Sequence, residues 1–238
     1  MRIYDSLISK VSLLLEKETS TNLKCTTSWP TSEEKVFLFT EDCSVELGPN
    51  NLPSTYLIAY TSDEKLVSKD EIILIGKDIS ELKGEVPFAR ITFINIDDSQ
   101  IKADQESYRI LRNIEYHRYK VNPQGYMIRV NTNQIREGAR VSTVSQKKGL
   151  SFSDIGTKFL TEYKKDPKVR FVKQVFITSE SFDYDSLRKI SHINEGITVA
   201  LDHIMKNLKM DCNTCSFKDI CDSIEGMRDI HKREEYQM

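Results

Sequence analysis

The order in which β-type and helical segments follow one another is the feature that most limits the fold of this chain. Short runs rich in branched and aromatic residues predict strands, and amphipathic stretches with a period of 3.6 residues predict helices. The expected strands lie at residues 35–40, 56–60, 71–75, 88–96, 126–131, 139–144 and 169–178. The expected helices lie at residues 2–17, 103–119, 151–165, 185–210 and 222–236. This mixed order predicts an α+β fold built of mixed α/β layers.

Length and composition allow one large domain or two small ones. The chain has 238 residues, of which 39% are hydrophobic and 29% charged, so it can bury a sizeable core. We divide it into an N-terminal helix and strand packed on the core (1–42), a central α+β domain (43–184) and a helical segment with cysteines (185–238). No apolar run reaches the roughly 20 residues of a membrane helix, and polar residues interrupt the N-terminal apolar run. A cytoplasmic protein is therefore expected.

Three of the five cysteines, Cys212, Cys215 and Cys221, form a C-x2-C-x5-C cluster. Thiolates at these spacings can converge on one metal ion or cluster. The polar neighbours argue against inert buried thiols, and a redox dithiol would need only the C-x2-C pair. The spacing resembles the iron–sulfur staple of some RecB-like nucleases, where a distant cysteine completes the site. We therefore expect a [4Fe-4S] cluster, with zinc as the alternative.

A fourth ligand is needed, because a tetrahedral zinc site and a cubane cluster both normally take four. The candidates are Cys25, Cys43, His203, His231 or an external ligand. The sequence leaves this choice open.

The net charge of −2 hides a segregation of charge along the chain. Residues 1–100 carry 10 basic and 17 acidic side chains, whereas residues 101–150 carry 10 basic and 4 acidic ones. Arginine forks bind phosphate groups, so the basic segment can hold a nucleotide-like cofactor or nucleic acid. A solvated face that pairs with the acidic part is the other interpretation. The candidate cofactor-binding residues are Arg112, Arg129, Arg136 and Arg140.

Motifs of known catalytic function are missing from the sequence. It contains no Walker A, G-x-G-x-x-G, H-E-x-x-H or G-x-S-x-G pattern, and we assign no catalytic residue. The isoelectric point near 6.1 disfavours nucleic acid as the partner. Whether the chain is an enzyme stays open at this point.

Six short runs follow one another between about residues 43 and 180. They are VELGP at 45–49, EIILIGKDI at 71–79, VPF at 86–88, LRNIEY at 111–116, ARVS at 139–142 and KGLSFSDIG at 148–156. In this order they resemble the central α+β domain of acetyl-CoA synthase, the β subunit of the carbon monoxide dehydrogenase/acetyl-CoA synthase complex.

The resemblance implies that arginines of this domain contact coenzyme A. Arg112 and Arg140 match arginines of the family's runs, whereas Arg129 and Arg136 do not, and Gly138 stands where the family's run has an aromatic residue. The family's catalytic domain carries four cysteines and a C-G-C nickel chelate, but this sequence contains no C-x-C pair. The chain alone is therefore not expected to make acetyl-CoA by the family mechanism.

Our leading hypothesis is a stand-alone relative of that central domain, which binds a metal or iron–sulfur cluster. It would serve as a binding or accessory component in one-carbon and acetyl-CoA metabolism, with a corrinoid or CO dehydrogenase-type component as its protein partner. One alternative is an acyl- or methyl-transfer enzyme component that binds coenzyme A at the arginines. The other is a nucleic-acid-binding protein with an iron–sulfur staple.

Overall fold

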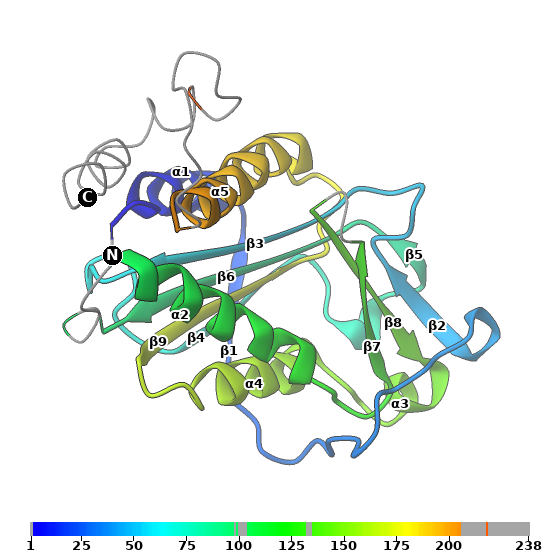
Figure 1. The fold of residues 1–238 in the computed structure, drawn as a ribbon. Helices are drawn as coiled ribbons and strands as arrows, with labels where there is room; N and C mark the ends of the chain where they lie inside the picture. The colour runs from blue at the N-terminus through cyan, green and yellow to red at the C-terminus, as the bar shows by residue number, and fades with distance from the viewer. Residues whose placement is uncertain (1, 98, 100–103, 132–134, 206–217, 219–238) are drawn as a thin grey trace, which may run out of the picture.

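A computed structural model describes residues 2–97, 99, 104–131, 135–205 and 218. Its largest layer is a five-stranded sheet with helices on both faces (Figure 1). Helices α1 (Asp5–Leu15) and α5 (Tyr184–Met205) pack together against strand β3, and α4 (Phe152–Tyr163) packs on the other face against β4 and β9. Helix α2 (Asp104–Tyr116) packs against α5 and continues into the short helix η3 (His117–Lys120), which contacts α4.

The large sheet has the strand order β1-β4-β9-β6-β3. Its strands are β1 (Ser20–Leu23), β4 (Glu71–Ile75), β9 (Val169–Ile177), β6 (Phe88–Ile96) and β3 (Ser54–Thr61). The pairs β4/β9 and β6/β3 are parallel, whereas β1/β4 and β9/β6 are antiparallel. All nine residues of β6 are buried, because helices cover this strand on both faces.

A second sheet of four strands stands beside one end of the large sheet (Figure 1). Its order is β5-β2-β8-β7, with β5 (Gly84–Val86), β2 (Cys43–Leu47), β8 (Arg136–Ser142) and β7 (Tyr126–Asn131). Strand β2 is parallel to β5 and antiparallel to β8, which is antiparallel to β7. Strand β8 contacts β3 and β6, and the short helix α3 (Thr143–Lys147) follows it. We call these two layers the large sheet and the small sheet.

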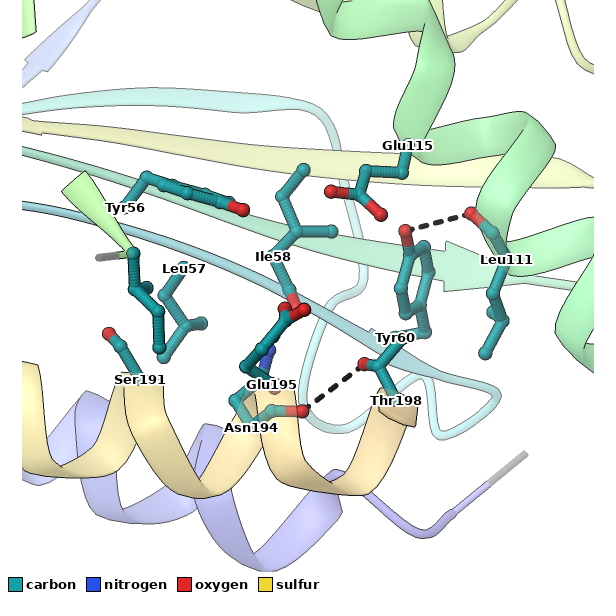
Figure 2. Close-up of a pocket in the computed structure, with 11 residues that line it drawn as sticks. Tyr56, Leu57, Ile58, Tyr60, Leu111, Glu115, Ser191, Asn194, Glu195 and Thr198 are labelled. Atoms are coloured by element: carbon teal, nitrogen blue, oxygen red, sulfur yellow. Dashed lines mark hydrogen bonds between the residues drawn. The ribbon is translucent and has the colours of Figure 1, made fainter. Parts of the chain in front are cut away.

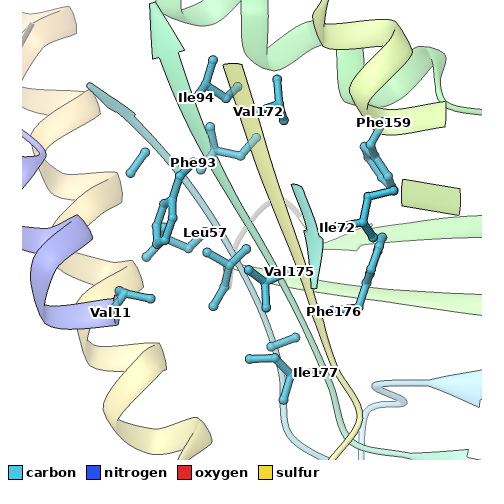
Figure 3. Packing of buried hydrophobic residues seen from close by; sticks show 14 of the residues in the cluster. Val11, Leu57, Ile72, Phe93, Ile94, Phe159, Val172, Val175, Phe176 and Ile177 are labelled. Carbon is cyan, nitrogen blue, oxygen red and sulfur yellow. The ribbon is translucent and has the colours of Figure 1, made fainter. Parts of the chain in front are cut away.

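Aromatic side chains fill the space between the large sheet and α4 (Figure 3). The Phe176 ring stacks on Phe152 with the ring centroids 4.7 Å apart, and it also contacts Phe88 and Phe159. Val175 and Ile177, its neighbours in β9, point to the opposite face, toward α1 and α5, because side chains alternate along a strand. The predicted α+β fold of mixed layers is thereby confirmed.

Six of the seven expected strands and four of the five expected helices have counterparts in the structure, and the fifth expected helix, at 222–236, lies outside the described residues. Residues 35–40 do not form the expected strand. The segment is extended, yet its amides donate to side chains: Val36 N to Asn122 Oδ1 and Leu38 N to Met127 Sδ. The first β segment of the chain is instead β1, where the polar stretch of residues 18–34 predicts a loop. The strand β2 was not expected as such either.

A buried ion pair joins the two sheets. Arg90 of β6 and Glu137 of β8 expose 0% and 1% of their side chains. Arg90 Nη2 donates to Glu137 Oε2 at 2.7 Å, and Arg90 Nε donates to Glu137 Oε1. Arg118 of η3 also reaches Glu137, with 3.8 Å between Nη1 and Oε2. The positive charge of Arg90 in the large sheet is thus balanced inside the core by the carboxylate of Glu137 in the small sheet.

No helix in the parts of the chain that the structure describes is long and apolar enough to cross a membrane.

Candidate anion-binding cleft

The outer face of the small sheet gathers charged side chains from neighbouring strands. Glu46 of β2 lies opposite Arg140 of β8, and Arg129 of β7 lies opposite Gly138. Residues directly opposite each other point to the same face, and so do residues two apart along a strand. Arg129, Arg140, Glu46 and Arg136 therefore share this face, with Gly138 between them.

Glu46 holds two of these arginines. Its Oε1 accepts from Arg129 Nη1, and its Oε2 lies 3.4 Å from Arg140 Nε. Arg140 Nη1 also donates to the carbonyl of Leu38 at 3.0 Å, which ties the extended segment before β2 to the sheet. Arg129 is the more open of the two, because 36% of its side chain is exposed against 19% for Arg140.

Between β7, β8 and the connection from β2 to β3 lies a cleft of about 320 Å³. It is lined by Gly48, Asn50, Ser54, Arg129, Val130, Arg136 and Gly138. This volume is at the lower end of the range for small-molecule sites, roughly 300–1,000 Å³. The cleft can accept a phosphate-bearing group of a cofactor, but a complete cofactor such as coenzyme A would extend beyond it.

Gly138 forms the floor of the cleft, where the chain after β2 crosses β8. A Cβ atom at this position would lie 2.5 Å from the carbonyl oxygen of Leu47 and 2.9 Å from that of Gly48. Both contacts are to backbone atoms, which cannot rotate away. Glycine is therefore required by the close approach of two backbone segments.

The fourth candidate arginine, Arg112, lies elsewhere in the fold. It belongs to α2, where Nη1 donates to Glu115 Oε2 at 2.7 Å and Nε donates to the hydroxyl of Tyr108 at 3.1 Å. Its Nη2 is 4.0 Å from Glu195 Oε1 on α5. Burial alone would lower the pKa of Arg112, but these hydrogen bonds and the Glu115 charge raise it overall. The structure thus brings together Arg129, Arg136 and Arg140 and places Arg112 at a helix–helix contact.

A smaller pocket lies beside this contact, between α2, α5 and β3. Figure 2 shows Glu115 and Glu195 pointing into the space between the two helices, with Tyr56 and Tyr60 of β3 behind them. Its free volume is about 10 Å³, which is room for roughly one water molecule. Burial raises the pKa of Glu195, and the charge of Arg112 opposes this shift. The pocket is too small for a cofactor.

The family model of the CO dehydrogenase/acetyl-CoA synthase complex beta subunit matches residues 34–181 of this chain, well over half of its length. The chain belongs to this family. The match contains the small sheet, the cleft and four of the five strands of the large sheet, whereas α1, β1 and α5 lie outside it. A search of curated proteins finds no match.

The cysteine motif lies outside both the family match and the described residues. This holds for Cys212, Cys215, Cys221 and the candidate ligand His231, while His203 belongs to α5. Cys25 is exposed, and the thiol of Cys43 in β2 donates to the carbonyl of Phe39 at 3.0 Å. Within the described ranges, no three His, Cys, Asp or Glu side chains are grouped so that they could hold a metal ion. The predicted cluster therefore stays a prediction.

Sequence reasoning missed the residues that complete the cleft. Glu46 forms ion pairs with Arg129 and Arg140. Asn50 and Ser54 line the cleft on the side of the connection from β2 to β3. The Gly48-Pro49-Asn50-Asn51 stretch indicated a turn, and this was the one available signal for that wall. Nothing in the sequence indicates that this turn folds against β8 of the family domain.

Proposed function

We propose that this family member is a binding component of a CO dehydrogenase/acetyl-CoA synthase-type system, which holds a ligand of the coenzyme A class at the small sheet. The observation that carries the proposal is the cleft of about 320 Å³ lined by Arg129 and Arg136. Planar guanidinium groups match phosphate oxygens in geometry and charge. A phosphate-bearing group is the ligand chemistry that such a cleft favours.

The charge balance of this face supports an anionic ligand. Two carboxylates share the face with the three arginines, because Glu85 of β5 lies beside Glu46 in the register of the sheet. Glu85 accepts a hydrogen bond from Asn51 Nδ2 at 2.9 Å. The arginines thus outnumber the carboxylates, and one positive charge remains for a ligand.

We do not propose that this chain by itself assembles acetyl-CoA. The C-G-C nickel chelate belongs to the family's catalytic domain, and the 238 residues of this chain contain no C-x-C pair. An acyl- or methyl-transfer component that uses coenzyme A at this face is the alternative in which the chain is an enzyme. The family is a subunit of a complex, so a protein partner is expected, and we propose a corrinoid or CO dehydrogenase-type component.

Isothermal titration calorimetry with coenzyme A tests the cleft. We expect Arg129→Ala to weaken binding roughly 10- to 100-fold, because a hydrogen bond to a charged group contributes about 1.5–3 kcal/mol. Arg109→Ala removes the same charge from an exposed position of α2 and should bind like the wild type. No binding by the wild-type protein, or equal affinities of the two variants, would contradict the proposal.

The C-x2-C-x5-C motif supports a second function, the binding of a [4Fe-4S] cluster or zinc by Cys212, Cys215 and Cys221. Thiolates are soft ligands, which suit both kinds of centre. The motif lies after the family match, so it would add a metal centre to the central domain.

Protein purified without oxygen is expected to be brown, with broad visible absorbance, iron and acid-labile sulfide. Cys215→Ser should lose the metal, because it removes one of three local thiolates. Cys25→Ser and Cys43→Ser are the matched controls, and loss of metal in one of them would identify the fourth ligand. A colourless wild-type protein that contains zinc supports the zinc alternative, and one without any metal refutes the metal site.

A further inference from the structure

Arg129 and Arg136 line the same cleft, but their guanidinium groups are used differently. Among the described residues, the acceptor for Arg129 is the carboxylate of Glu46. Arg136 instead directs all three of its nitrogens to the connection between β2 and β3. Its acceptors are Ser54 Oγ at 2.9 Å from Nε, the carbonyls of Pro49 and Leu52 at 2.8 Å from Nη2, and that of Asn50 at 3.3 Å from Nη1.

These four hydrogen bonds occupy most of the donors of Arg136. A guanidinium has five N–H groups, so one is left for any other acceptor. The connection of residues 48–54 turns around the guanidinium and directs three carbonyls toward it. The carbonyl of Pro49 also accepts from Leu52 N at 3.1 Å, so Arg136 adds its donors to a turn that the backbone itself closes.

Arg136 also differs from Arg129 and Arg140 in having no carboxylate partner in the described part of the chain. Within the described part of the chain, no carboxylate lies within 4.0 Å of it, whereas Arg129 and Arg140 share Glu46. Arg136 therefore adds positive potential to the cleft while its donors hold the wall. Charge and hydrogen bonding can be separated by experiment, because lysine keeps the first and loses most of the second.

We propose that Arg136 is a positioning residue: it fixes the 48–54 connection as one wall of the cleft, and Arg129 supplies the guanidinium that contacts the anionic ligand. This inference rests on the proposed binding of a coenzyme A-class ligand in the cleft. It gives different roles to two residues that the sequence groups together as candidate cofactor-binding arginines.

The first measurement uses the full chain without ligand. Amide hydrogen-exchange rates are read at Leu52, whose N–H donates to the carbonyl of Pro49 at 3.1 Å; exchange is expected to speed up at least about tenfold in Arg136→Ala and in Arg136→Lys, since both remove the guanidinium that holds the carbonyls of Pro49 and Leu52 in this turn. Arg129→Ala should leave these rates unchanged. Unchanged rates in Arg136→Ala would overturn the positioning role, whatever the ligand.

The second measurement is the dissociation constant for coenzyme A, taken at a temperature at which circular dichroism shows all variants folded. We expect Arg136→Lys to bind as weakly as Arg136→Ala, about tenfold below the wild type, because the charge alone does not restore the wall. Wild-type affinity of Arg136→Lys would show that only charge matters and would overturn the inference. If wild-type protein does not bind coenzyme A, the proposed function fails, and the exchange rates alone decide whether Arg136 holds the connection.

Discussion

Replacing Glu137 by alanine is expected to lower the free energy of unfolding by about 3–5 kcal/mol, the usual cost of leaving a buried charge without its partner. Arg90 is the charge in question, and none of its side chain is exposed. Its remaining contacts include Thr92, whose Oγ1 accepts from Nη1 at 2.9 Å, and the ring of Phe159, whose centroid lies 4.4 Å from Cζ. Thr92 Oγ1 in turn donates to Gln174 Oε1 at 2.9 Å, so the neighbouring side chains cannot easily rearrange around Arg90.

The Glu137→Ala variant also removes a carboxylate from the neighbourhood of a second arginine, Arg118. Arg118 exposes 4% of its side chain, and its contacts include the carboxylates of Glu137 at 3.8 Å and Glu115 at 3.3 Å. Its Nη2 also donates to the hydroxyl of Tyr119 at 2.6 Å, and its Cζ lies 4.1 Å from the centroid of the Tyr56 ring. Without Glu137, the one carboxylate among the described residues that lies within 4.0 Å of either guanidinium group is that of Glu115. Because Arg90 belongs to the large sheet and Glu137 to the small sheet, the variant weakens the junction between them.

Urea denaturation followed by circular dichroism measures this effect. Glu64→Ala is the matched control, because it breaks the exposed ion pair with Arg170 and should change stability by about 0.5 kcal/mol or less. The double variant Arg90→Met/Glu137→Leu should recover the part of the loss that comes from Arg90, since it removes both charges of that pair and keeps apolar volume, while Arg118 still lacks Glu137. A loss for Glu137→Ala no larger than that for Glu64→Ala would show that water reaches Arg90.

The sequence predicts the elements whose periodicity reflects burial. Residues 88–96 form β6, the most buried strand, and the helix expected at residues 151–165 is α4, which follows its N-cap Ser151. The prediction of a strand at residues 35–40 is wrong because the hydrophobic alternation is present but the backbone bonds to side chains, not to another strand. Phe37 and Phe39 point outward, 80% and 65% exposed, while Val36 and Leu38 face the small sheet. Alternating hydrophobic residues indicate an extended chain with one face buried. They do not indicate that another strand hydrogen-bonds to its backbone.

The strand β1 is the opposite case. Ser20, Thr21 and Asn22 are polar and exposed, so no hydrophobic pattern marks them, yet the strand pairs with β4 through its backbone. An edge strand of this kind is defined by its partner. The candidate site is likewise defined by which strands pair, and not by a local sequence pattern. Arg129 and Arg140 meet because three strands align them around Glu46, whereas Arg112, which matches the family's runs, lies on α2.

Replacing Gly138 by tryptophan is expected to abolish coenzyme A binding and to lower the free energy of unfolding by about 1–3 kcal/mol, the usual cost of overpacking. The Cβ atom would meet the carbonyl oxygen of Leu47 at 2.5 Å, so the chain after β2 must move. The indole would lie beside Arg129, which is opposite Gly138 in the sheet, and would occupy the cleft.

Calorimetry with coenzyme A and urea denaturation measure the two effects separately. Gly138→Ala tests the backbone contact alone, because its methyl group meets Leu47 without filling the cleft, and it should lose stability while retaining part of the affinity. Lys147→Trp adds the same bulk at an exposed position of α3 and should change neither quantity. Full stability of Gly138→Ala would mean that the connection after β2 yields at little cost.

The family's run has an aromatic residue at the position of Gly138, and such a side chain does not fit the present structure. An aromatic side chain and the present course of residues 48–54 cannot occupy the same space, because Gly48 and Leu47 direct their carbonyls at the site of its Cβ. Gly138 and the wall held by Arg136 therefore depend on each other. A chain with tryptophan at this position must route the connection from β2 to β3 differently, and the cleft described here would not form in it.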